Sequence, residues 1–172
     1  AWYGQAVSFI AARAITTGTG ESYFSPQAKL TRGQFIVMLM NAYGLAAAAD
    51  PRDNFADAGA TYYTDYLAAA KHLNIANGVG DNRFAPEREI TRQEMFTLLA
   101  NALQGLNKMP PATSGKTLTS FTDREEIAPW AQPAMRLLVE TGIISGDGNQ
   151  LFPTSTTTRA EMAQVLYNLL IQ

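Results

Sequence analysis

Residues 84–94 of this chain read FAPEREITRQE, and this stretch decides the fold because it occurs three times. The version at residues 24–34 reads FSPQAKLTRGQ, and a more divergent version at residues 151–161 reads LFPTSTTTRAE. In all three, the arginine lies six positions after the proline. The offsets are 60 residues from Thr31 to Thr91 and 67 residues from Thr91 to Thr158, which indicates three tandem repeats.

Two further features recur upstream of each stretch. A glycine precedes it, and an aromatic residue lies sixteen positions before that glycine. The glycines are Gly18, Gly78 and Gly146, and the aromatic residues are Trp2, Tyr62 and Trp130. Apolar residues at helical spacing follow each aromatic, as in Ala6, Val7 and Ile10 after Trp2, and predict a helix that ends near the glycine.

A second helix is predicted to begin at each Thr-Arg pair. The threonine is followed three residues later by glutamate or glutamine, and this spacing is typical of a capping box, in which each residue's side chain accepts from the other's backbone N–H. The pairs are Thr31 with Gln34, Thr91 with Glu94, and Thr158 with Glu161. Apolar stripes follow, and we expect these helices, the most apolar of the chain, to lie together at its centre.

The chain is therefore expected to be all-α, with helix–loop–helix repeats at residues 1–44, 55–105 and 121–172 that form one compact triplet. Residues 45–54 and 106–120 are predicted to be linkers between the repeats. Phe-x-Asp tripeptides open the second and third repeats at residues 55–57 and 121–123, whereas the place of the first would precede Ala1. We expect that the N-terminal part of the first repeat is missing and that a leader or upstream domain has been removed.

Composition excludes several classes of protein. The 172 residues include no cysteine and one histidine, His72, which excludes disulfides, thiolate zinc sites, thiol nucleophiles and multi-histidine metal sites. A net charge of −2 does not favour nucleic-acid binding, and the longest apolar run, residues 35–40, is far shorter than the ~20 residues that cross a bilayer. With no phosphate-binding or dinucleotide motif, we expect no enzyme activity, no metal and no cofactor.

The order of the motifs resembles the S-layer homology domain. It runs Phe-x-Asp (55–57 and 121–123), Trp-Ala (130–131), glycine, Phe-x-Pro (24–26 and 84–86) and Thr-Arg-x-Glu (91–94 and 158–161). The resemblance implies a pseudo-threefold helical prism around a central three-helix bundle. It also implies an extracellular module that anchors a bacterial surface or S-layer protein non-covalently to the cell wall, as part of a larger polypeptide.

The resemblance also implies the ligand, a secondary cell wall polymer that in many Gram-positive members carries pyruvylated N-acetylmannosamine. Some Gram-negative relatives bind peptidoglycan instead, and the sequence does not separate these two ligands. The alternative from another class is a helical-repeat scaffold that binds a protein, such as a neighbouring S-layer subunit. Neither nucleic-acid binding nor membrane insertion is expected.

Arginine occupies the first position of each predicted second helix, at Arg32, Arg92 and Arg159. Exposed amides and the positive end of the helix dipole favour an anion there. A guanidinium beside them suits a carboxylate, such as that of a pyruvate ketal, through two parallel hydrogen bonds. The competing interpretation is that each arginine pairs with a neighbouring carboxylate of the protein.

The other candidate ligand-binding residues also have structural alternatives. Trp2, Tyr62 and Trp130 are expected to stack against a sugar ring, and the alternative for Trp2 and Trp130 is that they lie at least half in the core. Asp57 and Asp123 are expected to accept from sugar hydroxyls or to cap a helix. Gly18, Gly78 and Gly146 are expected to let the backbone approach a ligand or to serve a backbone conformation. Because Gln34, Tyr62 and Leu151 depart from the pattern, the three repeats are not expected to bind equally.

Overall fold

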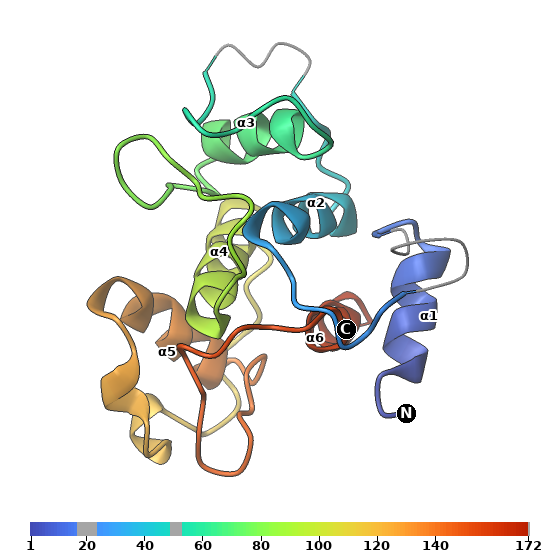
Figure 1. Ribbon diagram of the computed structural model, residues 1–172. Coiled ribbons are helices and arrows are strands. Elements are labelled where there is room, and N and C mark those ends of the chain that lie inside the picture. The colour runs from blue at the N-terminus through green and yellow to red at the C-terminus, as the bar shows by residue number, and fades with distance from the viewer. Residues whose placement is uncertain (17–23, 49–52, 172) are drawn as a thin grey trace. The chain divides into compact units, whose positions relative to one another are not determined.

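The computed structural model describes residues 1–16, 24–48 and 53–171, and within these ranges it is helical, with no strand (Figure 1). The α-helices are α1 (Gly4–Ala12), α2 (Arg32–Ala42), α3 (Thr64–His72), α4 (Arg92–Gly105), α5 (Gln132–Glu140) and α6 (Arg159–Leu170). Short 3-10 helices are η1 (Leu118–Ser120), η2 (Arg124–Glu126) and η3 (Pro129–Ala131). The prediction of an all-α chain with two helices in each repeat is confirmed. The prism and the repeat boundaries stay predictions.

The chain divides into two compact units. The first unit comprises residues 1–90 and 157–172 and contains α1, α2, α3 and α6, whereas the second comprises residues 91–156 and contains α4 and α5. In the first unit α3 packs on α2 and α1 packs on α6, and in the second unit α5 packs on α4. Each first helix of a repeat therefore packs on the second helix of another repeat, not on its own.

Burial differs between the first and second helices of the repeats. In α2 the buried residues include Phe35, Ile36, Met38, Leu39 and Met40, so more than one face is covered. The second helix α4 is likewise buried on several faces, whereas α1 buries only Ala6 and Ile10. A helix that is apolar on several faces has to lie inside its unit, and one with a narrow stripe lies at the surface.

All three predicted capping boxes are present. The hydroxyl oxygens of Thr31, Thr91 and Thr158 accept from the backbone N–H three residues later, at 3.2, 3.3 and 3.2 Å. In return, the side chain at that third position accepts from the threonine N–H, at 3.0, 3.1 and 2.8 Å. The boxes fix the start of α2, α4 and α6, which is where the predicted arginines stand.

Three backbone hydrogen bonds form a closed ring in the first unit, directly before the capping threonines. Leu30 N–H donates to the carbonyl of Thr157 at 2.9 Å, Ile90 N–H to that of Leu30 at 2.9 Å, and Thr157 N–H to that of Ile90 at 3.1 Å. All three side chains are fully buried. Thr157 is the polar member of this ring, and within the described part of the chain its hydroxyl is buried without a hydrogen-bond partner.

We predict that Thr157→Val stabilises the protein. Valine has the shape of threonine, and removing a buried, unsatisfied hydroxyl avoids a desolvation cost of about 1–3 kcal/mol. Thermal unfolding followed by circular dichroism should show a higher Tm. The matched control is Thr158→Val, the same change one residue later, which removes a helix cap and should cost about 1 kcal/mol. A lower Tm for Thr157→Val would show that the buried hydroxyl does not destabilise the protein.

Candidate functional site

Each predicted arginine contacts the loop of another repeat. Arg32 Nε donates to the carbonyl oxygen of Phe84 at 2.8 Å, and Arg159 Nε donates to that of Phe24 at 2.9 Å, both within the first unit. In the second unit Arg92 Nε donates to the carbonyl oxygen of Leu151 at 2.9 Å. The acceptor is in every case the first residue of the Phe-x-Pro segment or its Leu-x-Pro equivalent. The Nε atom of each arginine therefore makes a hydrogen bond between repeats.

The helix N-termini are already occupied by these same loops. The first two backbone N–H groups of α2, α4 and α6 donate to loop carbonyls at 2.8–3.0 Å. The acceptors are Arg88 and Pro86 for α2, Ser155 and Pro153 for α4, and Ala28 and Pro26 for α6. The third N–H of each helix donates to the capping threonine, so the first three N–H groups all have partners. The expectation that exposed amides receive an anion is therefore wrong. An anion at these helix starts would therefore have to be recognised by side chains.

Asp57 and Asp123 hold the Phe-x-Pro loop of their own repeat. The carboxylate of Asp57 accepts from the N–H groups of Phe84 and Ala85 at 2.8 and 2.9 Å. Asp123, which is buried, accepts from Leu151 at 2.9 Å and Phe152 at 2.7 Å. The alternative that these residues cap a helix is wrong, since α3 begins after Tyr63 and Asp123 makes no capping hydrogen bond at η2.

The carboxylates of Asp57 and Asp123 stabilise a backbone conformation that L-amino acids rarely adopt. The residue before the proline has a positive φ in all three repeats, at 53° for Ser25, 57° for Ala85 and 51° for Phe152. A left-handed conformation costs free energy when the residue has a side chain. Two hydrogen bonds from one carboxylate to Phe84 and Ala85, and likewise to Leu151 and Phe152, help to offset that cost.

Gly78 and Gly146 are needed for their backbone conformation, which is the structural alternative to letting the backbone approach a ligand. Gly78 and Gly146 have φ values of +83° and +73°. A Cβ atom at Gly78 would lie 2.5 Å from the carbonyl oxygen of Arg83 and 2.9 Å from the ring of Phe55. At Gly146 it would lie 2.7 Å from the Gln150 carbonyl oxygen and 2.7 Å from the Phe121 ring. Gly18, the third predicted glycine, lies outside the described residues.

The three aromatic residues are at the surface. Trp2 is 63% exposed, Tyr62 58% and Trp130 57%, so the interpretation that Trp2 and Trp130 lie at least half in the core is wrong. Trp2 packs edge-on against Tyr3, with ring centroids 5.2 Å apart, and Tyr62 packs similarly against Tyr63 at 5.1 Å. Trp130 belongs to η3, which packs on α4. Exposed aromatic rings offer flat apolar faces against which another ring can stack.

Tyr62 lies beside the start of α2. Burial and the negative charge of Glu87 raise the pKa of its hydroxyl. Hydrogen bonds with Thr31 and Gln34 and the positive charge of Arg159 lower this pKa, but the net shift is upward. Glu87 also accepts a hydrogen bond from the Tyr63 hydroxyl at 2.5 Å, and burial together with this contact raises the pKa of Tyr63 to about 12. Sequence reasoning gave Glu87 no role, since its carboxylate has no counterpart in the other two repeats, which carry Gln27 and Thr154 there.

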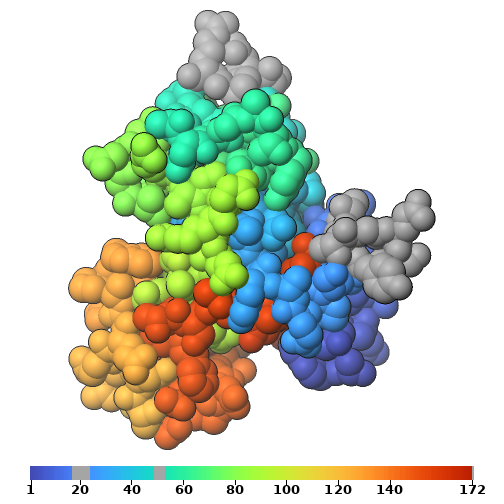
Figure 2. Space-filling model, viewed as in Figure 1, coloured from blue at the N-terminus to red at the C-terminus, as the bar shows by residue number. Residues whose placement is uncertain are grey.

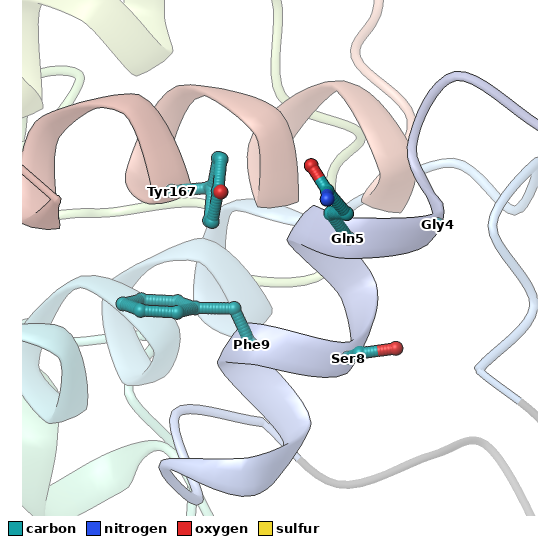
Figure 3. A pocket seen from close by; sticks show the side chains of 5 residues that line it. All are labelled: Gly4, Gln5, Ser8, Phe9 and Tyr167. Atoms are coloured by element: carbon teal, nitrogen blue, oxygen red, sulfur yellow. The ribbon is translucent and has the colours of Figure 1, made fainter.

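A shallow hollow of about 490 Å³ lies between α1 and α6 in the first unit (Figure 3). Gly4, Gln5, Ser8, Phe9 and Tyr167 line it, and the rings of Phe9 and Tyr167 meet edge to face at 5.1 Å. None of the predicted ligand-binding residues belongs to this lining. No aspartate, glutamate, histidine or lysine is among the residues that line it.

We predict that Gly146→Ala destabilises the protein more than Gly148→Ala. Both glycines have positive φ values, +73° and +60°, and share a conformational penalty of about 1 kcal/mol. Only at Gly146 would the new methyl group also collide with backbone, whereas no atom lies within 4 Å at Gly148. Chemical denaturation of both variants checks this, and equal losses would show that the close approach has no cost.

We predict that Asp57 makes stability depend on pH in the acid range. Burial raises its pKa, but hydrogen bonds from backbone N–H groups, chiefly of Phe84 and Ala85, and the charge of Arg83 outweigh it, so the pKa lies below its usual 3.8. A lowered folded-state pKa gives stability that is fully present above pH 3.8 and lost as the pH falls through the folded-state value.

Asp57→Asn should therefore be less stable than wild type at neutral pH and lose less stability on acidification. Urea midpoints measured across the acid range report this difference. The control is Asp65→Asn, which removes one exposed carboxylate from α3 of the same unit and should keep the wild-type acid dependence. An unchanged acid dependence in Asp57→Asn would remove Asp57 as its source.

The described residues offer neither a metal-binding cluster nor a membrane-spanning helix. Within these ranges, no cluster of three or more histidine, aspartate or glutamate side chains is placed to hold a metal ion. The helices described are all too short or too polar to span a bilayer.

Comparison with known proteins identifies the repeats. The S-layer homology domain matches residues 1–36, 54–96 and 120–163. The S-layer protein sap of Bacillus anthracis is 30% identical over 165 residues, which are 96% of this chain and 20% of that protein. The exoglucanase XynX of Acetivibrio thermocellus is 29% identical over 171 residues, 98% of this chain and 15% of that enzyme.

An uncharacterized cell wall amidase of Bacillus anthracis is 28% identical over 165 residues, 96% of this chain and 30% of that protein. The chain thus spans less than a third of the length of these relatives. Three tandem matches together cover well over half of the chain and coincide with the capping boxes, the loop-binding arginines and the loop-holding aspartates. The chain belongs to the S-layer homology domain family, as three tandem copies of that domain.

Proposed function

We propose that this chain anchors a larger bacterial surface or S-layer protein non-covalently to the cell wall and catalyses no reaction itself. The observation that carries the proposal is that the same module recurs in S-layer proteins, an exoglucanase and a cell wall amidase. Proteins with such different names share a part that covers 15–30% of their length. A part common to proteins of unlike activity is best explained as an attachment module, located outside the cell in the wall or S-layer.

The proposed ligand is an anionic secondary cell wall polymer, and specifically a pyruvylated glycan. Arginine guanidinium groups match a pyruvate carboxylate, and each charge-assisted hydrogen bond contributes about 1.5–3 kcal/mol where it is partly desolvated. The exposed rings of Trp2, Tyr62 and Trp130 suit the flat faces of sugar units. The net charge of −2 is no obstacle, since binding depends on the local field at the arginines.

The test is co-sedimentation of the chain with purified cell-wall sacculi, before and after acid extraction of the non-peptidoglycan polymer. We expect sedimentation before extraction and its loss afterwards. Sedimentation that survives extraction would identify peptidoglycan as the ligand. No sedimentation in either case would overturn the anchoring function and favour a protein partner.

A paired set of variants tests whether the exposed rings take part. Trp2→Ala together with Trp130→Ala should reduce binding to sacculi by about tenfold, since a stacked aromatic side chain contributes about 0.5–1.5 kcal/mol. Leu73→Ala with Val79→Ala is the control, because these apolar side chains are also exposed and neither residue is predicted to bind the ligand. Equal binding by the two double variants would contradict the role of the tryptophans.

A further inference from the structure

The helix pair α1–α6 is less covered than the equivalent pair α2–α3 of the same unit. Phe9 and Tyr167, which line the hollow in Figure 3, are both half-buried. Alignment of the repeats on their exposed aromatic residues and capping threonines places Ala69 and Met40 at these positions of the α2–α3 pair. Ala69 is 8% exposed and Met40 is fully buried. Helix α1, dark blue in Figure 2, lies at the surface of the first unit, and its groove with α6 is open where the α2–α3 groove is closed.

The second half of α6 also leaves apolar side chains partly exposed. Val165, Leu169 and Leu170 are half-buried. Their counterparts in α4 are almost fully buried, at 6% exposed for Leu98, 0% for Ala102 and 1% for Leu103. Apolar side chains that are exposed on one helix and covered on its equivalent favour a further packing partner for α6.

The polypeptide that leaves α2 covers the α2–α3 groove. Leu45 N–H donates to the carbonyl oxygen of Met40 at 2.8 Å, which turns the chain back over the end of its own helix. Ala48 N–H then donates to the carbonyl oxygen of Asp65, in the first turn of α3, at 3.0 Å. The segment after the second helix is thereby fixed on the first helix that is paired with it.

The end of the same linker returns to this place. The side chain of Asn54 donates to the carbonyl oxygen of Thr64 at 2.9 Å, one residue before Asp65. In the alignment of the repeats, Thr64 and Asp65 correspond to Gly4 and Gln5. Gly4 and Gln5 both line the hollow between α1 and α6. The hollow therefore lies at the positions that a linker occupies in the α2–α3 pair.

The polypeptide that leaves α4 behaves in the same way within the second unit. Lys108 N–H donates to the carbonyl oxygen of Leu103 at 2.8 Å and turns the chain back. Ser114 then binds α5, since its N–H donates to the carbonyl oxygen of Glu140 at 3.0 Å and its hydroxyl to that of Val139 at 2.7 Å. In both units the segment that follows the second helix packs on the first helix beside it.

The segment that precedes a first helix has another role. The ring of Phe55 packs against the ring of Phe84, with centroids 5.3 Å apart, and Asp57 binds the backbone of the same Phe-x-Pro loop. A Phe-x-Asp segment is thus directed chiefly to its loop. Continuity with the two linkers favours the polypeptide that follows α6 as the occupant of the α1–α6 groove.

We propose that the groove between α1 and α6 binds the residues that follow Gln172 in the parent protein. The inference rests on the proposed function in that the chain is part of a larger protein. Ala48 lies 17 positions after Thr31, and the same spacing from Thr158 falls three positions beyond Gln172. The backbone N–H at that position donates to the carbonyl oxygen of Gln5, which can accept it besides the bond of its own helix, since a carbonyl oxygen has two lone pairs.

The chemistry of the groove suits such a segment. The lining has the apolar rings of Phe9 and Tyr167 and the uncharged polar groups of Gln5 and Ser8. Residues 45–48 of the first linker, which read LAAA, are likewise uncharged and small. Docking of the segment would cover the exposed part of α6, join the end of the third repeat to the first repeat, and fix the place where the rest of the parent protein begins.

The absence of cysteine permits a test with a single thiol. Ser8→Cys places this thiol in the lining of the hollow. Its rate of modification by iodoacetamide is compared between the chain that ends at Gln172 and the chain extended by the next fifteen residues of the parent protein, the length of the linker 106–120. Extension should slow modification by about tenfold, because the thiol reacts only when the docked segment opens. Ser145→Cys, at an exposed serine of the second unit, should react equally in both chains.

An extension of glycine and serine of the same length is the control for shielding by any added tail. Equal slowing by that extension, or no slowing by the natural residues, would overturn the inference. A parent protein whose polypeptide ends at Gln172 would overturn it too. Modification that slows in the unextended chain as its concentration rises would show that a second copy covers the groove instead.

A variant that fills the hollow gives an independent test. The natural extension should raise the Tm by about 2–4 °C. Gly4→Trp should abolish this rise, because a Cβ atom at Gly4 meets no atom within 4 Å and the indole can occupy the groove without disturbing the fold. Gly105→Trp is the matched control at a second helical glycine whose Cβ atom meets no atom within 4 Å, and it should keep the rise. An undiminished rise in Gly4→Trp would contradict docking in the hollow.

Neither measurement involves the cell wall, so the outcomes separate this inference from the proposed function. Sedimentation with sacculi together with unaltered modification of Ser8→Cys would overturn the docking and leave anchoring intact. Slowed modification without sedimentation would overturn anchoring and leave the docking intact.

Discussion

The fold depends on how the N-termini of the second helices are satisfied. The first amides of an α-helix have no partner inside the helix, and a buried helix start needs partners from elsewhere. In α2, α4 and α6 the first two amides bind loop carbonyls of another repeat, and the third binds the capping threonine. A single repeat cannot complete its own helix start, because the acceptors come from outside it.

The same constraint explains most of the repeated residues. The proline segment supplies the carbonyls, Asp57 and Asp123 hold that segment in a left-handed conformation, and Gly78 and Gly146 leave room for the phenylalanines that precede those aspartates by two positions. The ring of hydrogen bonds through Leu30, Ile90 and Thr157 then joins one residue from each repeat. Much of the motif that identifies the family is thus explained by folding rather than by ligand contact.

We propose that ligand binding uses the positions that this scaffold leaves exposed. Trp2, Tyr62 and Trp130 protrude from three equivalent places, while the arginines beside the helix starts differ in how far they are enclosed. Small changes in the loop produce these differences, since Phe84 and Phe24 cover their arginines and Leu151 replaces the ring in the third repeat. A repeat architecture can in this way keep one fold while its sites diverge.

The sequence by itself determined the repeats, because the same motif occurs three times. It also determined the six α-helices of the described residues and their capping boxes, because helical periodicity and capping depend on residues close together in the chain. It also predicted which residues are special. Only the tertiary structure decided what they do: it filled the helix amides with loop carbonyls, turned Asp57 and Asp123 toward backbone N–H groups, and exposed Trp2 and Trp130. These outcomes depend on contacts between residues far apart in the chain, such as Arg159 with Phe24, and no local pattern specifies such contacts.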